Sequence, residues 1–130
     1  MPSAPVYVET IIDDVLKSSA AVQAACGGRV YPVKIPQGKP LPVAVYQRIA
    51  SEPDTTMQGY TSERVILVVK CFAMSYAQCK ALALAVREAL SQPPLSAVLR
   101  DEADLFENEG GAYCIHAEYA CQQLGGYCNG

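Results

Sequence analysis

Residues 59–90 constrain the fold more than any other stretch, because their pattern predicts one long strand followed directly by one amphipathic helix. Residues 63–73 are rich in β-branched side chains, which suit a pleated and partly buried surface. Successive side chains of a strand point to opposite faces, and here both faces are mostly apolar. We therefore expect a central strand that is covered on both sides.

The helix that follows has clear start and stop signals. Ser75 and Gln78 have the spacing of a capping box, in which the Ser hydroxyl accepts a hydrogen bond from the third helical amide. Apolar residues then recur at helical spacing: Cys79, Leu82, Ala83, Val86 and Leu90. Pro93 and Pro94 end the helix, because proline has no amide to donate. The pattern predicts a helix over residues 75–91.

The N-terminal part predicts a second helix over residues 6–25, with an apolar stripe and with Pro5 in its first turn. Gly27 and Gly28 should end it, since glycine enters the left-handed conformation at least cost. Four prolines at positions 32–42 exclude a helix and a central strand there. A short extended piece is expected at residues 30–33.

Two further strands are expected, near residues 43–50 and 112–123, where side chains alternate in character. Between the first of these and the central strand, residues 51–62 should form a long hairpin excursion that breaks the strand pattern. Residues 95–100 predict a linker with room for a helical turn, followed by an acidic segment over residues 101–108.

The expected fold class is α+β, with a mostly antiparallel sheet of about four strands and two main helices packed against it. The 130 residues are enough for one domain, which we place at residues 1–124, and the Gly-rich residues 125–130 should form a flexible tail. Charged residues make up only 18% of the chain, below the usual quarter. This shortage of charge predicts that another chain covers part of the surface.

The bulk properties also bear on partners and location. The net charge of −3 offers no basic footprint for binding phosphates. No apolar run approaches the ~20 residues of a membrane span, and no basic region followed by an apolar core marks a secretory signal. We therefore expect a chain that stays in the cytoplasm of the cell that makes it.

Six cysteines occur in the sequence: Cys26, Cys71, Cys79, Cys114, Cys121 and Cys128. Without a secretory signal, a disulfide framework is not expected. No C-x-x-C pair exists and the single histidine lies among strand residues, so a zinc site is not expected either. We interpret Cys71, Cys79 and Cys121 as small buried hydrophobes and Cys128 as an exposed thiol. No metal or cofactor is predicted.

His116 and Glu118 are the one pair that could carry acid–base chemistry, since residues two apart on a strand share a face. A solvated or interface face is the interpretation that we favour. The sequence contains no G-x-S-x-G nucleophile elbow. The prediction is a protein that is not an enzyme.

Several landmarks follow one another in a characteristic order. They are Gly-Gly-Arg-Val-Tyr-Pro at 27–32, Pro-Gln-Gly-Lys-Pro-Leu-Pro at 36–42, Val-Ala-Val-Tyr at 43–46, the strand 64–72, Ser75-Tyr76 and the Ala/Leu-rich helix to residue 90. This order, over about residues 8–123, resembles the tail-completion, or tail-to-head joining, family of long-tailed bacteriophages and prophages. That family is similar to phage tail terminators. The cysteine content and the Gly-rich end depart from its pattern.

The resemblance implies a structural virion protein that forms a homo-oligomeric ring, typically hexameric. Such a ring caps the finished tail tube and presents a surface to the head connector. It therefore implies three partners, namely further copies of the chain, the tail tube protein and the head connector protein. DNA would pass through without sequence-specific binding, and no membrane is involved. The protein would lie in the virion tail or neck after assembly in the host bacterial cytoplasm.

The residues expected at the assembly interface are Asp54, Met57, Gln58, Tyr60, His116 and Glu118. The first four lie in the hairpin excursion, and Met57 and Tyr60 are of the adaptable or amphipathic kind that is enriched where proteins meet. Two alternatives remain open. One is a non-catalytic interaction module of another assembly. The other is a small-molecule-binding or enzyme domain, which would need an apolar pocket with convergent polar groups that the sequence does not nominate.

Overall fold

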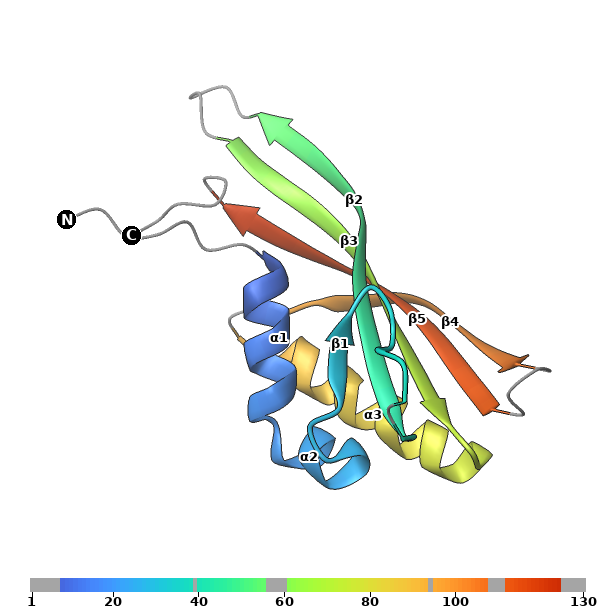
Figure 1. Ribbon diagram of the computed structural model, residues 1–130. Coiled ribbons are helices and arrows are strands. Elements are labelled where there is room, and N and C mark those ends of the chain that lie inside the picture. Colours follow the sequence, from blue (N-terminus) through green and yellow to red (C-terminus); the bar gives the residue numbers. More distant parts are fainter. Residues whose placement is uncertain (1–7, 39, 56–60, 94, 108–111, 125–130) are drawn as a thin grey trace.

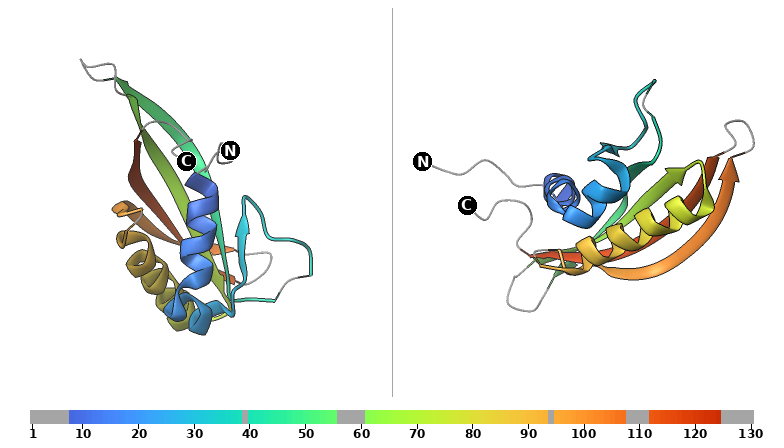
Figure 2. Two further views of the ribbon diagram at one scale, coloured as in Figure 1. Left: turned by 90° about the vertical axis from the view of Figure 1, so that its left-hand side faces the viewer. Right: turned by 90° about the horizontal axis from the view of Figure 1, so that it is seen from below.

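One sheet and three helices make up the computed structural model, which describes residues 8–38, 40–55, 61–93, 95–107 and 112–124. The sheet has five strands in the order β1-β2-β3-β5-β4, and the helices lie on one side of it (Figures 1 and 2). The elements are α1 (Val8–Ser18), α2 (Ala20–Cys26), β1 (Val30–Pro32), β2 (Val43–Thr55), β3 (Thr61–Ala73), α3 (Tyr76–Ser91), β4 (Val98–Glu107) and β5 (Ala112–Leu124).

The predicted central strand is confirmed as β3, which pairs antiparallel with β2 on one edge and with β5 on the other. Its Leu67 and Val69 belong to the core beneath the helices. Ile66 and Val68 point to the opposite face and are buried as well. Burial on both faces explains why this strand is a nearly continuous apolar run.

Helix α3 also follows the prediction. The hydroxyl oxygen of Ser75 accepts a hydrogen bond from the Gln78 N–H at 3.1 Å, and the helix ends at Ser91. The predicted apolar stripe is fully or almost fully buried: Cys79, Leu82, Ala83, Val86 and Leu90. Helix α3 contacts β3 and β5, so this stripe closes the core over the middle of the sheet.

The prediction of one continuous N-terminal helix was wrong, because Ser19 ends α1 and caps α2. Its backbone is extended (φ −74°, ψ 123°), and its hydroxyl oxygen accepts a hydrogen bond from Val22 N–H at 3.3 Å. Serine favours such a cap over a helix interior, since its side chain competes for backbone amides. The predicted end at Gly27 is confirmed, with this residue in the left-handed conformation (φ 63°).

The sheet has more strands than predicted, and it is mixed. β1 runs parallel to β2, whereas the other three strand pairs are antiparallel. The acidic segment, for which no strand was predicted, forms the edge strand β4 together with the end of the predicted linker. Two of its carboxylates bind α3: Glu102 lies 3.7 Å from Lys80, and Asp104 accepts a hydrogen bond from the Tyr76 hydroxyl at 2.7 Å. Polar contacts with α3 therefore help to hold β4 in place, and its sequence lacks the alternation of apolar residues that would have indicated a strand.

The expected hairpin excursion over residues 51–62 is largely regular strand. The β2–β3 ladder continues to the pair Thr55–Thr61, and residues 56–60 lie outside the described part of the chain. Pro53 is tolerated because β1 pairs only with Ala44, Val45 and Tyr46, so the outer edge of β2 faces no described strand at this point. The end of the hairpin extends past the helix layer (Figure 1). The predicted tail at residues 125–130 also lies outside the description.

A side-chain hydrogen bond joins α1 to the sheet, in addition to the ion pair between Glu9 of α1 and Arg48 of β2. The buried Tyr46 of β2 donates its hydroxyl hydrogen to Asp13 of α1 at 3.0 Å, and Asp13 also pairs with Lys17 at 3.0 Å. Burial and the neighbouring carboxylate raise the pKa of the Tyr46 phenol. The phenol is therefore a protonated donor throughout the neutral range.

We expect Tyr46→Phe to lower the free energy of unfolding by about 1 kcal/mol, because it removes a hydrogen bond to a partly exposed carboxylate. Urea unfolding followed by circular dichroism measures the change. Tyr31→Phe on β1 is the matched control, since its hydroxyl has no hydrogen-bond partner in the described part of the chain. Equal losses in both variants would show that the Tyr46–Asp13 contact does not stabilise the fold.

Candidate functional site

The expected interface residues do not form one site. Asp54 is paired with Ser62 near the end of the hairpin, whereas His116 is paired with Lys70 in the middle of the sheet. Ser62 and Lys70 are eight positions apart on β3, which corresponds to about 26 Å at the usual rise of a strand. Met57, Gln58 and Tyr60 lie outside the described residues. Two separate surfaces must therefore be considered.

The first surface is the hairpin arm, by which we mean residues 51–55 of β2 and 61–64 of β3. β5 accompanies it almost to its end, since Leu124 pairs with Ser62. The arm is therefore three strands wide over most of its length and is not an isolated hairpin, which would be marginally stable on its own. The ladder hydrogen bonds fix its direction relative to the sheet.

The second surface is the open face, by which we mean the side of the sheet that carries no helix. The predicted sharing of a face by His116 and Glu118 is confirmed, since β-strand alternation places both there, half-buried. Glu118 forms an ion pair with Arg100 of β4 at 3.4 Å. Within the described residues no hydrogen bond joins His116 to Glu118. The pair therefore has the setting of a surface contact and lacks the geometry of a general base with its orienting partner.

The open face has a buried apolar layer and charged side chains nearer the solvent. Six of its side chains are buried outside the core beneath the helices: Val43, Val45, Ile66, Val68, Ala112 and Cys114. The half-buried Lys70 and Glu118 lie in the same rows, beside Val45 and Val68 respectively. On the β4 side, Val98 and Leu105 remain exposed. An apolar centre with a polar margin is typical of a surface that meets another protein.

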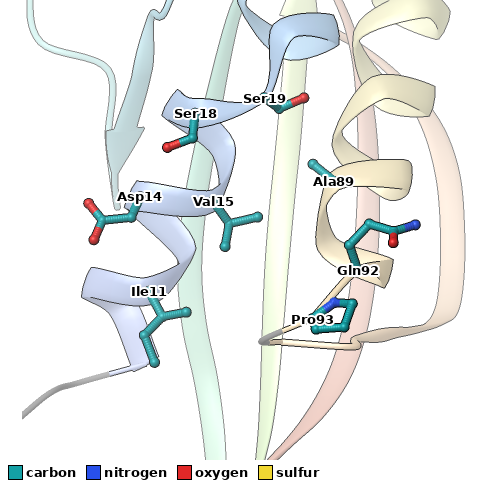
Figure 3. A pocket seen from close by; sticks show the side chains of 8 residues that line it. All are labelled: Ile11, Asp14, Val15, Ser18, Ser19, Ala89, Gln92 and Pro93. Atoms are coloured by element: carbon teal, nitrogen blue, oxygen red, sulfur yellow. The ribbon is translucent and has the colours of Figure 1, made fainter.

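A cavity of about 560 Å³ lies between α1 and the end of α3 (Figure 3). Its lining consists of Ile11, Asp14, Val15, Ser18, Ser19, Ala89, Gln92 and Pro93. Val15 points toward α3, whereas the Asp14 carboxylate points away from it (Figure 3). The Ser19 hydroxyl already caps α2. The polar groups do not converge on the cavity, so it lacks the arrangement that orients a small-molecule ligand.

The cysteines of the described chain have the setting of core residues. Cys71, Cys79 and Cys121 belong to the hydrophobic core, as the sequence predicted. Burial raises the pKa of each of these thiols, and the Cys79 thiol donates a hydrogen bond to the Cys71 carbonyl at 3.0 Å. A thiol that stays protonated is a poor nucleophile and a poor metal ligand. Among the described residues, no three His, Cys, Asp or Glu side chains cluster to hold a metal ion.

The contribution of β4 to the open face was not predicted from the sequence. Arg100, Asp101 and Leu105 lie there beside β5. Asp101, Ala103 and Leu105 occupy every second position, as residues on one face of a strand do. The charged residues between and around them obscured this pattern in the sequence. No helix of the described chain is long and apolar enough to cross a membrane.

Comparisons with known proteins agree with this description. The family model of tail completion protein gp17 matches residues 12–120. No curated protein matches the chain. Among solved structures, a chain in the virion of a native gene transfer agent particle is similar, with a TM-score of 0.67 and 18% sequence identity. The similarity covers 88% of this chain and 92% of that chain, and at this identity it shows a shared fold.

We expect Cys71→Ser to lower the free energy of unfolding by about 1–3 kcal/mol, because it buries a hydroxyl in an apolar core. Cys71→Ala is the matched control, since it removes the sulfur without adding a polar atom. The serine variant should be the less stable of the two in urea unfolding. A serine variant as stable as the wild type would contradict the burial of Cys71 among apolar groups.

Thiol labelling tests the cysteine assignment as a whole. The five cysteines of the described chain are buried, so at most one of the six thiols, that of Cys128, should react with a thiol reagent in the native protein. All six should react after unfolding in guanidinium under reducing conditions. Rapid native labelling of two or more thiols would mean that the core opens readily or that the assignment is wrong.

Proposed function

Because the chain belongs to the tail completion protein gp17 family, we propose that it forms a homo-oligomeric ring that caps the phage tail tube and joins the tail to the head. The family assignment makes it a structural protein of the virion tail. Its structural neighbour is a chain of a gene transfer agent virion, which is consistent with this role. The ring, the capping and the joining are the proposal, and six copies is the number that the resemblance implies.

The hairpin arm is the observation that supports this proposal most directly. A three-stranded extension reaches beyond the helix layer (Figure 1). Its paired strands carry a length of backbone away from the helices in a fixed direction, which suits contact with a neighbouring subunit or with the tube. We assign Asp54 to this contact, together with Met57, Gln58 and Tyr60 from the connection between the two strands.

The open face supplies a second contact in the same proposal. His116 and Glu118 lie half-buried beside its buried apolar layer. Charge at the margin and apolar groups in the centre allow a partner to bind without a deep pocket. We assign this face to a protein of the assembly, either the tail tube protein or the head connector protein.

The role requires no catalysis and no cofactor. DNA would pass through the ring, and a net charge of −3 on each copy disfavours tight binding of phosphates during that passage. The protein would reside in the tail or neck of the virion after assembly in the host cytoplasm. The cavity between α1 and α3 does not favour a small-molecule function, because its polar groups do not converge.

The experiment is complementation of a phage or prophage that lacks the protein. Replacing Met57 and Tyr60 together by Asp should leave the circular dichroism spectrum of the purified domain unchanged. It should block tail completion, because two charges would lose water in a packed contact. Infectious titre and negative-stain images of the particles provide the measurement.

Ala77→Asp with Ala81→Asp is the matched control, since both positions are exposed on α3 and the variant adds the same two charges. It should complement normally. If the arm variant folds and still gives infectious tailed particles, the arm is not the contact. If particles that lack the protein altogether are complete and infectious, the proposed function itself is wrong.

A further inference from the structure

Charge is segregated between the two edges of the sheet. Residues 29–48, which contain β1 and the start of β2, carry four basic residues and no acid: Arg29, Lys34, Lys39 and Arg48. Residues 98–107, which form β4, carry one basic and four acidic residues: Arg100, Asp101, Glu102, Asp104 and Glu107. The two segments therefore have net charges of +4 and −3. β1 and β4 are the outermost strands, so they lie at opposite edges of the sheet (Figure 2).

Some of these charges are already engaged within the chain. Arg48 lies 3.5 Å from Glu9, and Arg29 donates a hydrogen bond to the Pro42 carbonyl at 3.0 Å. Lys34 is exposed and forms no ion pair with the described residues. On β4, Asp101 is exposed, and among the described residues its carboxylate accepts only a local hydrogen bond from the next amide. Lys34 and Asp101 are therefore the charges best placed for an external partner.

Each edge also exposes a large apolar side chain beside these charges. Val33, next to Lys34, is 63% exposed and has a φ of 66°. The left-handed region is costly for a β-branched residue, and such strain persists where surrounding contacts enforce it. Here the Val33 N–H donates to the Tyr46 carbonyl at 2.8 Å. Leu105, which lies on the same face of β4 as Asp101, is 50% exposed.

Neither edge favours the addition of a further strand. β1 has three residues, and the last is Pro32, which has no amide hydrogen. β4 carries the acidic side chains that natural proteins use to discourage edge pairing. A contact at these edges must therefore come from side chains, where charge and apolar complementarity decide the partner.

We infer that, in the ring proposed above, the β1 edge of one copy packs against the β4 edge of the next copy. Lys34 lies beside Asp101 of the neighbour, and Val33 packs near Leu105. A two-fold dimer through either edge would place like charges together, which is unfavourable. Contact between unlike edges is head-to-tail, and such contacts close into rings when the rotation allows it. This inference rests on the proposed function, since it names the surface that holds the ring together.

The test is a charge swap, read as assembly state by sedimentation velocity and by negative-stain images of the protein on isolated phage tails. Lys34→Glu and Asp101→Lys should each raise the subunit dissociation constant at least about tenfold, because each replaces attraction by repulsion. The double variant Lys34→Glu with Asp101→Lys restores the pairing in reverse and should recover assembly. Added salt should weaken the wild-type ring.

Glu88→Lys on the exposed side of α3 is the control for a change of charge alone, and it should assemble like the wild type. If the wild type forms rings and both single variants do so equally well, or if the double variant fails to recover, the edge assignment is wrong and the ring proposal stands. If the wild type forms no ring either in solution or on tails, the ring proposal fails and the edge assignment fails with it.

Discussion

The fold depends on a strand that is enclosed on all four sides. β3 has a paired neighbour on each edge and buried side chains on each face, so its position fixes that of every other strand. The helices cover one face, where Leu67 and Val69 join the main core. On the other face, Ile66 and Val68 are buried as well, outside the core beneath the helices. The same strand therefore anchors both the core of the domain and the surface available to partners.

The elements that could be predicted are those whose signals are local. The apolar run of β3, the Ser75 cap and the glycine at position 27 each act within a few residues. β4 could not be predicted in the same way, because its acidic residues are stabilised by Lys80 and Tyr76 of a different element. The break at Ser19 was missed because serine is compatible with both a helix surface and a cap, and only packing decides between them.

The same distinction applies to the candidate site. That His116 and Glu118 share a face follows from strand alternation, and the structure bears it out. Their distance from Asp54 could not be inferred, because the sequence around Pro53 suggests that pairing stops, whereas the ladder continues to Thr55. Proline interrupts a ladder only where its missing amide would have faced a strand, and the outer edge of β2 is open there. The segment after residue 50, which resembles a loop in the sequence, is therefore part of the paired hairpin arm.

The distribution of charged residues explains how so small a domain can have a defined orientation in an assembly. With only 18% of its residues charged, the chain has the exposed Lys34 just after one edge strand of the sheet and an excess of acidic residues on the other edge strand. A pair of copies joined through unlike edges always leaves one edge of each kind unsatisfied, so the contact favours further addition. Addition ends without exposed edges only when the last copy meets the first. A closed ring is therefore the arrangement in which every copy satisfies both edges, and the arm and the part of the open face around His116 and Glu118 remain free for the proteins above and below it.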